Sequence, residues 1–530
     1  MIPCLWEAAL CVRAAVSWIC RSRPSSRKSK GGLSEASLKV RASFDYNSCI
    51  ASLEDYMPAK ITGEVSRVVG LVAHVRGIVA PVGSLLVIEH PEGEIEAEVI
   101  GFTEDNAIVM PFGAIRGVAP SANVRLISPS QQVPVSDALL GRVIDGRGRP
   151  MDGKGPVPDC IMRPVYAPGP DPLDRTPIDE VLATGVRSID GLMTCGKGQR
   201  VGLFSGSGVG KSVLLGMIAR FTSADVVVIA LVGERGREVR QFIERELGEE
   251  GMKRGVLVVA TSEQPALMRV KAPFVATAVA EHFRDRGKNV LLLMDSLTRM
   301  AYAQREIGLS AGEPPATKGY PPSVFAAFPR LLERAGRIAV GSITGFYNVL
   351  VDADDINEPV ADAVRGIIDG HVWLSRDLAN RAHYPAVDAL QSVSRVMIDV
   401  TEKEHQEYAS EILGMLAVYR DAEDLINIGA YAKGSNPEID RAIAKMPEIV
   451  RFLRQDLFEK STLEDAVTGI RNIVKGAKPV EASGESADAP SAGRAAGPGP
   501  ASGLAGFQAP GLIPGVAPPS AKPEDAEGAA

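Results

Sequence analysis

A glycine-rich stretch that joins an apolar run to an amphipathic segment constrains the fold of this chain more than any other feature. The sequence LFSGSGVGKSVLL, residues 203–215, comes close to the phosphate-binding pattern G-x-x-x-x-G-K-[ST]. Ser205 stands where the strict pattern has glycine, and a small residue fits there if its φ angle stays negative. The loop follows a predicted strand and precedes a predicted helix, the context in which such loops bind a nucleotide.

Each part of the loop has a predicted role in holding phosphate. Its glycines allow the backbone to turn so that successive N–H groups point at phosphate oxygens. Lys211 would place its ammonium group at the β- and γ-phosphates, and the hydroxyl group of Ser212 would bind Mg²⁺. The helix that begins near Lys211 would direct the positive end of its dipole to the same place. The predicted nucleotide-binding residues of the loop are Ser205, Gly206, Ser207, Gly208, Val209, Gly210, Lys211 and Ser212.

Five continuous apolar runs place this loop in a parallel sheet. From about residue 135, apolar runs alternate with helical segments, and strands that are buried on both faces of a sheet have this continuous character. The pattern predicts a doubly wound α/β domain. The runs are QRVGLF, ADVVVIALVG, RGVLVVAT, KNVLLLMDS and RIAVGSITGF.

Two carboxylates follow buried runs of this kind. Asp295 ends the run VLLLMD, where a carboxylate is typical of a magnesium-water ligand, and Glu234 follows ALVG, where it could polarise an attacking water. The same residues also permit ordinary roles, with Asp295 as a helix cap and Glu234 as part of an Arg/Glu-rich surface turn. Arg235 adjoins Glu234 and is included with Glu234 and Lys211 among the catalytic candidates.

The segments on either side of the α/β domain have different patterns. Residues 60–130 contain short β-rich runs separated by Gly, Pro and Asn, which predict a small antiparallel barrel. This segment has few aromatic residues on which bases could stack, so a structural barrel is favoured over one that binds oligonucleotides. From Thr401 to about Lys478, apolar residues recur at helical spacing.

The two ends of the chain offer fewer constraints. Apolar residues at helical spacing in 34–57 predict a helix that either packs on the chain itself or docks a partner. The first 30 residues place their basic residues after the apolar stretch, unlike a signal peptide, and are open to three interpretations: a disordered segment, a surface-seeking helix or a start codon assigned too early. Residues 479–530 are rich in Pro, Ala, Gly and Ser and are expected to be disordered.

Composition disfavours several classes of function. The net charge of −7 disfavours a protein that binds nucleic acid over its whole surface. The six cysteines contain no C-x-x-C pair, and no His/Cys cluster has metal-ligand spacing, which fits free thiols in a reducing compartment. Apart from the apolar stretch in the first 30 residues, no run is long and uncharged enough to span a bilayer, so the sequence predicts a cytoplasmic protein.

Six motifs, taken together and in order, resemble the catalytic-subunit family of rotary ATP synthases. Within that family, the resemblance is greatest to the branch of flagellum-specific protein-export ATPases, and it covers residues from about 60 to 475. The motifs are GRVIDGRGRPMDGKGP, SGSGVGKS, VGERGREV, LLLMDSLTRMAYAQREI, GEPPATKGYPPSVFAAFPRLLERAG and HYPAVDALQSVSRVM.

The resemblance implies a fold and a division of the chain. The expected fold is α/β, with a P-loop RecA-like parallel-sheet core, an N-terminal small β-barrel and a C-terminal helical domain. The expected segments are an N-terminal extension with a docking helix (1–57), the β-barrel domain (58–132), the P-loop ATPase domain (133–400), the C-terminal helical domain (401–478) and a disordered tail (479–530).

The resemblance also implies roles for particular residues. It makes Glu234 the catalytic carboxylate and assigns Asp295, with the serine of the loop, to magnesium. Tyr384 matches a tyrosine that stacks on adenine, and Arg395 matches an arginine that reaches into the site of a neighbouring subunit. A structural ion pair between Arg395 and Asp399 is the alternative.

The expected function is that of a homohexameric motor that hydrolyses ATP with Mg²⁺ to energise delivery and unfolding of flagellar export substrates. The expected partners are a stator-like regulator, the membrane proteins of the export gate and chaperone–substrate complexes, and no nucleic acid. The protein would be cytoplasmic and peripherally associated with the inner-membrane export apparatus. An ATPase of a virulence-type secretion system is the alternative, and an RNA-translocating hexamer is a third reading.

Overall fold

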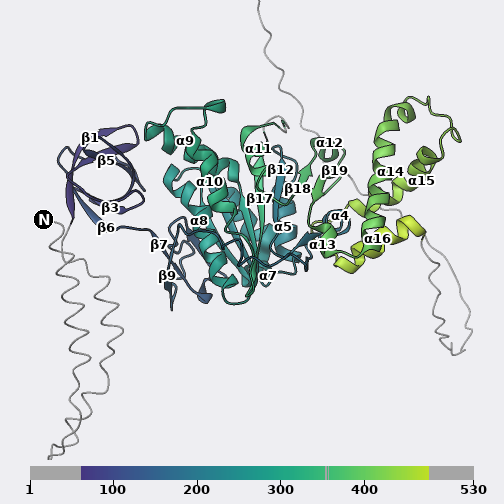
Figure 1. Cartoon of the computed structure of the whole chain (residues 1–530), viewed down its shortest axis with the longest axis horizontal. Coiled ribbons are helices and arrows are strands. Elements are labelled where there is room, and N and C mark those ends of the chain that lie inside the picture. The colour runs from purple at the N-terminus through teal and green to yellow at the C-terminus, as the bar shows by residue number, and fades with distance from the viewer. Residues whose placement is uncertain (1–60, 352–354, 356, 477–530) are drawn as a thin grey trace, which may run out of the picture. The chain divides into compact units, whose positions relative to one another are not determined.

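The structure is a computed structural model that describes residues 61–351, 355 and 357–476 (Figure 1). The predicted docking helix of residues 34–57 and the predicted disordered tail of residues 479–530 lie outside the described residues. Within the described ranges, no helix is long and apolar enough to cross a membrane.

The first described segment forms a closed barrel of six strands. Neighbouring strands are antiparallel, and β6 pairs with both β1 and β3, which closes the barrel in the order β1-β2-β5-β4-β3-β6. Val75, Ile88 and Val109 are fully buried inside it, because alternate residues of each barrel strand face inward. The prediction of a small antiparallel barrel is confirmed. Its strands are β1 (Thr62–Val69), β2 (Val72–Arg76), β3 (Leu85–His90), β4 (Gly93–Thr103), β5 (Asn106–Pro111) and β6 (Asn123–Ser128).

The centre of the chain is a largely parallel sheet. Its strands lie in the order β19-β18-β12-β17-β15-β13-β14-β8, all parallel except β19, which pairs antiparallel with β18. The strands are β8 (Val143–Asp145), β12 (Arg200–Ser205), β13 (Val226–Val232), β14 (Gly255–Ala260), β15 (Asn289–Asp295), β17 (Ser342–Leu350), β18 (Gly370–Leu374) and β19 (Val387–Ser394).

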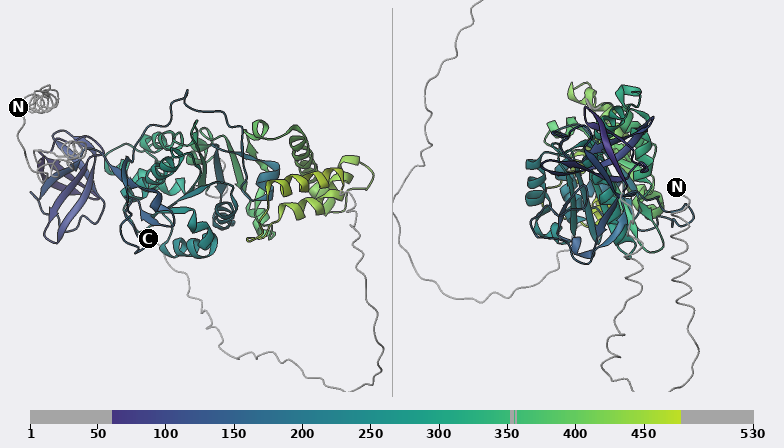
Figure 2. Two further views of the ribbon diagram at one scale, coloured as in Figure 1. Left: turned by 90° about the horizontal axis from the view of Figure 1, so that it is seen from below. Right: turned by 90° about the vertical axis from the view of Figure 1, so that its left-hand side faces the viewer.

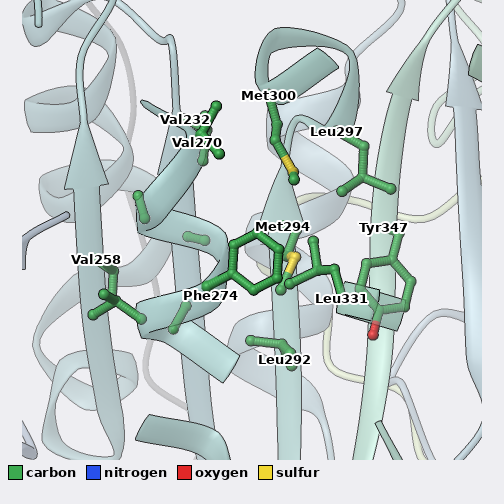
Figure 3. Close-up of a cluster of buried hydrophobic side chains, with 14 of the residues drawn as sticks. Val232, Val258, Val270, Phe274, Leu292, Met294, Leu297, Met300, Leu331 and Tyr347 are labelled. Atoms are coloured by element: carbon green, nitrogen blue, oxygen red, sulfur yellow. The ribbon is translucent and has the colours of Figure 1, made fainter. Parts of the chain in front are cut away.

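Helices cover both faces of this sheet (Figures 1 and 2). Side chains of a strand alternate between faces, so Val228 of β13 joins one buried core and its neighbour Val227 joins the other. The first core contains Phe274 of α8, Met294 of β15 and Leu331 of α10 (Figure 3). The second core is covered by α5. These helices are α5 (Lys211–Phe221), α8 (Ala266–Arg284), α9 (Leu297–Ser310) and α10 (Pro322–Leu332). The predicted doubly wound domain is therefore confirmed.

The fifth predicted run, RIAVGSITGF, is divided in the structure. Its start lies at the short strand β16 (Gly336–Arg337), which pairs antiparallel with β17, and the long strand begins only at Ser342. The strand then continues to Leu350 through Tyr347 and Asn348, whose polar groups ended the apolar run in the sequence. Both side chains are nevertheless fully buried.

The segment DALQSV, residues 388–393, lies outside the five apolar runs, so the sequence did not predict it as a strand of the sheet. It belongs to β19, the antiparallel edge strand of the sheet. Gln391 and Val393 are exposed while Val387 is buried, so the strand alternates in exposure near its end instead of forming one apolar run. An edge strand has fewer buried neighbours than a central one, which is why its composition gave a weaker signal.

Three helices end the described chain, as the spacing after Thr401 predicted. They are α14 (Lys403–Asn427), α15 (Pro437–Leu453) and α16 (Leu463–Lys475). Tyr408, Ile412 and Met415 of α14 are buried in the second core, together with residues of α15 and α16. The carboxylate of Asp465 and the hydroxyl of Thr462 form a capping box at the start of α16.

The barrel contacts the sheet domain through a buried ion pair. Lys271 of α8 has a side chain that is 1% exposed, and its Nζ lies 2.6 Å from Oε2 of Glu98 in barrel strand β4. The ammonium group also lies 4.5 Å from the ring centroid of Tyr166 and donates a hydrogen bond to its hydroxyl group. Because burial penalises an unpaired charge, these contacts tie the barrel to α8.

Candidate active site

The phosphate loop joins β12, which ends at Ser205, to α5, which begins at Lys211. Gly208 and Gly210 have φ angles of 81° and 90°, in the left-handed region where a side chain is strained. Ser205 is fully buried at the end of a strand and has no positive φ, so serine is accommodated there without strain. The expected departure from the strict pattern is therefore compatible with the loop geometry.

Lys211 and two carboxylates meet at the edge of the sheet where the parallel strands end. Its Nζ donates to Oδ1 of Asp295 at 2.7 Å and to Oε1 of Glu234 at 3.3 Å. Asn348 of β17 also donates to Oδ1 of Asp295, at 2.7 Å. Residues from four strands and their following loops thus converge on one point, which the sequence predicted for Lys211, Glu234 and Asp295 but not for Asn348.

Burial and neighbouring charges both shift the pKa values of Lys211 and Glu234. Burial alone would lower the pKa of Lys211, but the negative charges of Asp295 and Glu234 outweigh it and raise that pKa above its usual value. Burial raises the pKa of Glu234; Lys211 opposes this shift and the charge of Asp295 adds to it. A carboxylate whose pKa is raised is better suited to accept a proton.

Ser212, Glu234 and Asp295 line one cleft of about 130 Å³. Hydroxyl and carboxylate oxygens are the ligands that Mg²⁺ prefers, so these side chains fit the metal. In the described part of the chain, no group of three His, Cys, Asp or Glu side chains could hold a metal on its own. In nucleotide sites, Mg²⁺ is usually bound by one or two protein groups together with waters and the phosphates.

A second cleft, of about 320 Å³, is lined by Gly210 at the end of the phosphate loop. Tyr384 lines it and is partly exposed, and a Cβ atom at Gly210 would lie 3.3 Å from its ring. The loop of residues 454–459, from the C-terminal helical part, completes the cleft, and the backbone N–H of Gln455 donates to the carbonyl of Tyr384 at 3.0 Å. The resemblance predicted Tyr384 as a residue that stacks on adenine. Residues 454–459 were not predicted, because they carry no motif of their own.

The positions of two arginine residues were not anticipated from the sequence. Arg235, a catalytic candidate, is exposed and pairs with Glu238 at 3.1 Å instead of lining the cleft. Arg376, at the start of α12 (Arg376–Asn380), donates to the carbonyl of Ser207 at 3.3 Å and was not predicted. The structure thus places Arg376, and not Arg235, against the phosphate loop.

Arg395 follows the last residue of β19 and is exposed. Its guanidinium makes no hydrogen bond or ion pair with any described residue, so the alternative of a structural pair with Asp399 has no support. Because β19 is antiparallel to β18, its end lies level with Gly370 at the start of β18. Arg395 is therefore at the edge of the sheet opposite to Lys211.

Comparison with known proteins places this geometry in a family. Residues 185–394 match the nucleotide-binding domain of the ATP synthase alpha/beta family, and residues 65–126 match its beta-barrel domain. The chain is 52% identical over 429 residues to the flagellum-specific ATP synthase of Bacillus subtilis, which covers 80% of this chain and 97% of that relative. The chain belongs to the ATP synthase alpha/beta family. The resemblance seen in the motifs is thereby confirmed.

Further matches are to ATPases of type III secretion systems. Residues 401–472 match the C-terminal domain of the type III secretion ATPase EscN. The type 3 secretion system ATPase of Sinorhizobium fredii is 47% identical over 409 residues, which cover 77% of this chain and 91% of that relative. The assembled ATPase EscN of enteropathogenic E. coli has a TM-score of 0.75 and 46% identity, covering 78% of this chain and 100% of that chain.

Proposed function

We propose that this chain is the ATP-hydrolysing motor of a flagellar type III protein export apparatus. The observation that carries the proposal is the convergence of Lys211, Glu234 and Asp295 at the end of the phosphate loop, in a chain with this family membership. The flagellum-specific ATP synthases of Bacillus subtilis and Pseudomonas aeruginosa are 52% and 50% identical, over 80% and 79% of this chain.

The site residues have complementary roles in this proposal. The N–H groups of the phosphate loop and Lys211 would hold the phosphates of ATP, and Tyr384 would stack on adenine. Ser212 and Asp295 would hold Mg²⁺, which when bound offsets negative charge on the phosphates. Glu234 would orient the attacking water and accept its proton, which requires the ionised carboxylate.

Arg395 would complete the site of a neighbouring chain and not its own. It lies level with Arg200 at the start of β12, while the phosphate loop follows Ser205 at the other end. Six residues of strand separate the two points by roughly 16 Å, which is further than an arginine side chain reaches. A homohexameric ring in which each chain supplies both halves of a site satisfies this geometry, and EscN is known as an assembled ATPase.

The remaining partners belong to the same proposal. We expect residues 34–57 to dock a stator-like regulator, and the ring to meet export-gate membrane proteins and chaperone–substrate complexes at the cytoplasmic side of the inner membrane. Removal of residues 1–57 should leave the described fold intact but abolish co-purification with the regulator. Co-purification that survives this truncation would place the docking site elsewhere.

A virulence-type secretion ATPase is the second candidate function. The SPI-2 type 3 secretion system ATPase of Salmonella typhimurium is 53% identical, but over only 68% of this chain. Deletion of the gene followed by assays of motility and of flagellin export distinguishes the two. Loss of both, restored by the wild-type gene but not by Lys211→Ala, is the expected result. Unimpaired motility would overturn the flagellar proposal.

A further inference from the structure

Backbone and side-chain hydrogen bonds fix the main chain just before the exposed Arg395 guanidinium. The N–H of Arg395 donates to the backbone carbonyl of Asp369 at 3.0 Å. The hydroxyl of Ser394 donates to the carbonyl of Thr194 at 2.8 Å and accepts from Nε2 of Gln199 at 3.0 Å. Since the guanidinium itself has no partner among the described residues, the position of Arg395 is set by this anchored backbone.

Asp369 is in turn held by Arg200 through four hydrogen bonds. The guanidinium donates from Nε to Oδ2 and from Nη2 to Oδ1, both at 3.0 Å, and the backbone N–H of Arg200 also donates to Oδ2 at 3.0 Å. The N–H of Asp369 donates to the carbonyl of Arg200 at 2.8 Å. A bidentate Arg–carboxylate pair of this kind fixes orientation as well as distance.

The Arg200–Asp369 pair, called the clamp below, is largely buried and is supported by a second carboxylate, that of Glu333. The Arg200 side chain is 16% exposed and its Nη1 lies 2.5 Å from Oε1 of Glu333. Burial lowers the pKa of Arg200, but the charges of Asp369 and Glu333 outweigh it and raise that pKa, so the cation persists. At Gly370, a Cβ atom would lie 2.6 Å from the carbonyl oxygen of Val393, which shows how closely β18 and β19 approach here.

Arg200 is the first residue of β12 and Ser205, at the other end of the same strand, leads into the phosphate loop. We propose that Arg200 and Asp369 are positioning residues for Arg395. They hold Arg395, which each chain would present to the site of its neighbour, in a fixed place relative to the phosphate loop of the chain to which Arg395 belongs. The inference rests on the proposed function, since it requires Arg395 to act in the neighbouring site.

The test compares Asp369→Asn with a matched control in the full-length chain. Asp369→Asn removes the charge and one acceptor of the clamp with little change in size. The control is Asp152→Asn, because Asp152 forms the same bidentate pair with Arg142 at β8, the far end of the sheet. Arg200→Lys is a milder second variant, which keeps the positive charge but loses the two parallel N–H donors of the guanidinium.

We expect Asp369→Asn to lower kcat by about 10- to 100-fold, the effect of a small misplacement of a catalytic group, with the KM for ATP unchanged. Arg200→Lys should lower kcat in the same direction, and Asp152→Asn should leave it unchanged even if it lowers Tm. An unchanged kcat in both clamp variants, or an equal loss in the control, would overturn the proposal.

Mixed rings separate positioning in the neighbour from damage within the chain. Asp369→Asn chains mixed with Glu234→Gln chains form some interfaces at which an intact Glu234 meets a well-held Arg395, so part of the activity should return. No recovery in mixed rings would mean that Asp369 acts within its own chain. If Arg395→Ala itself hydrolyses ATP normally, the proposed role of Arg395 fails. If Arg395→Ala is impaired but Asp369→Asn and Arg200→Lys are both normal, the inference alone fails.

Discussion

At the scale of single residues, Lys211 holds the site together by its charge. Its side chain is 13% exposed and bridges Asp295 and Glu234, two carboxylates that would otherwise repel each other. Phosphate oxygens carry the same kind of charge, so the ammonium group would pair with phosphate as it now pairs with the carboxylates. A single cation between two acidic groups is therefore the most sensitive point of the site.

Lys211→Ala should abolish ATP binding or turnover while the fold survives. The described loop offers no other cation at this point, and α5 retains its apolar contacts in the second core. Phosphate release is the measurement, with circular dichroism to follow folding. The control is Lys197→Ala, which removes a lysine of the same domain that pairs with Glu180. Wild-type turnover by Lys211→Ala would contradict the assignment of the site.

The pH dependence of hydrolysis should report the raised pKa of Glu234. The group must be ionised to accept a proton, so kcat/KM should fall as the pH decreases through this pKa. Because burial raises the pKa, the acid limb should lie above the ordinary value of 4.5. Steady-state phosphate release from about pH 4.5 to about pH 9 measures it, with ring assembly checked at each pH. A flat profile down to about pH 4.5 would argue against Glu234 as the base.

At the scale of elements, the sequence predicted the strands that are buried on both faces of the sheet. It did not predict the parts of the fold that depend on contacts between distant segments. The central strands and the phosphate loop were evident because both faces of the sheet are covered, so β13 and β14 are wholly apolar. The edge strand β19 was missed because its exposure alternates, and the polar end of β17 was missed because it carries the buried polar residue Asn348, which donates to Asp295. Residues 454–459 reach the site from the C-terminal part, and a contact so distant in sequence leaves no local pattern.

The buried pair between barrel and α8 predicts a stability effect at the same scale. Lys271→Met should lower the free energy of unfolding by about 3–5 kcal/mol, because it leaves Glu98 buried without its partner. The double variant Lys271→Met with Glu98→Leu should recover most of this loss. Denaturant titration is the measurement, and Lys253→Met, in an exposed pair with Glu250, should cost about 1 kcal/mol or less.

The sign of the pH dependence follows from Glu98. Burial raises its pKa in the folded state, so in Lys271→Met the folded protein binds a proton more strongly than the unfolded chain. The loss of stability should therefore grow as the pH rises through the ordinary carboxylate range and beyond, and shrink as it falls. A loss that is independent of pH would show that packing of the lysine stem, and not charge, dominates.

At the scale of the whole molecule, the proposed function divides one site between two edges of the sheet that cannot meet within a single chain. Lys211, Glu234 and Asp295 lie at one edge of the sheet, and Arg395 lies at the other. In the proposed ring of identical chains, every interface would use both edges. The proposed ring would give the exposed guanidinium of Arg395, which has no partner in the described part of the chain, a partner in the adjacent site.

The activity of mixed rings tests this arrangement directly. Arg395→Ala should bind ATP yet hydrolyse it about 10³–10⁵-fold more slowly, as expected when an arginine supplied by a neighbour is lost. Glu234→Gln should also bind ATP without turnover. A mixture of the two should recover part of the activity, because some interfaces then join an intact Glu234 to an intact Arg395 of the adjacent chain. Phosphate release from mixtures of known composition is the measurement, with each variant alone as the control. If mixed rings form but stay inactive, Arg395 does not act across the interface, and the two edges of the sheet do not share one site.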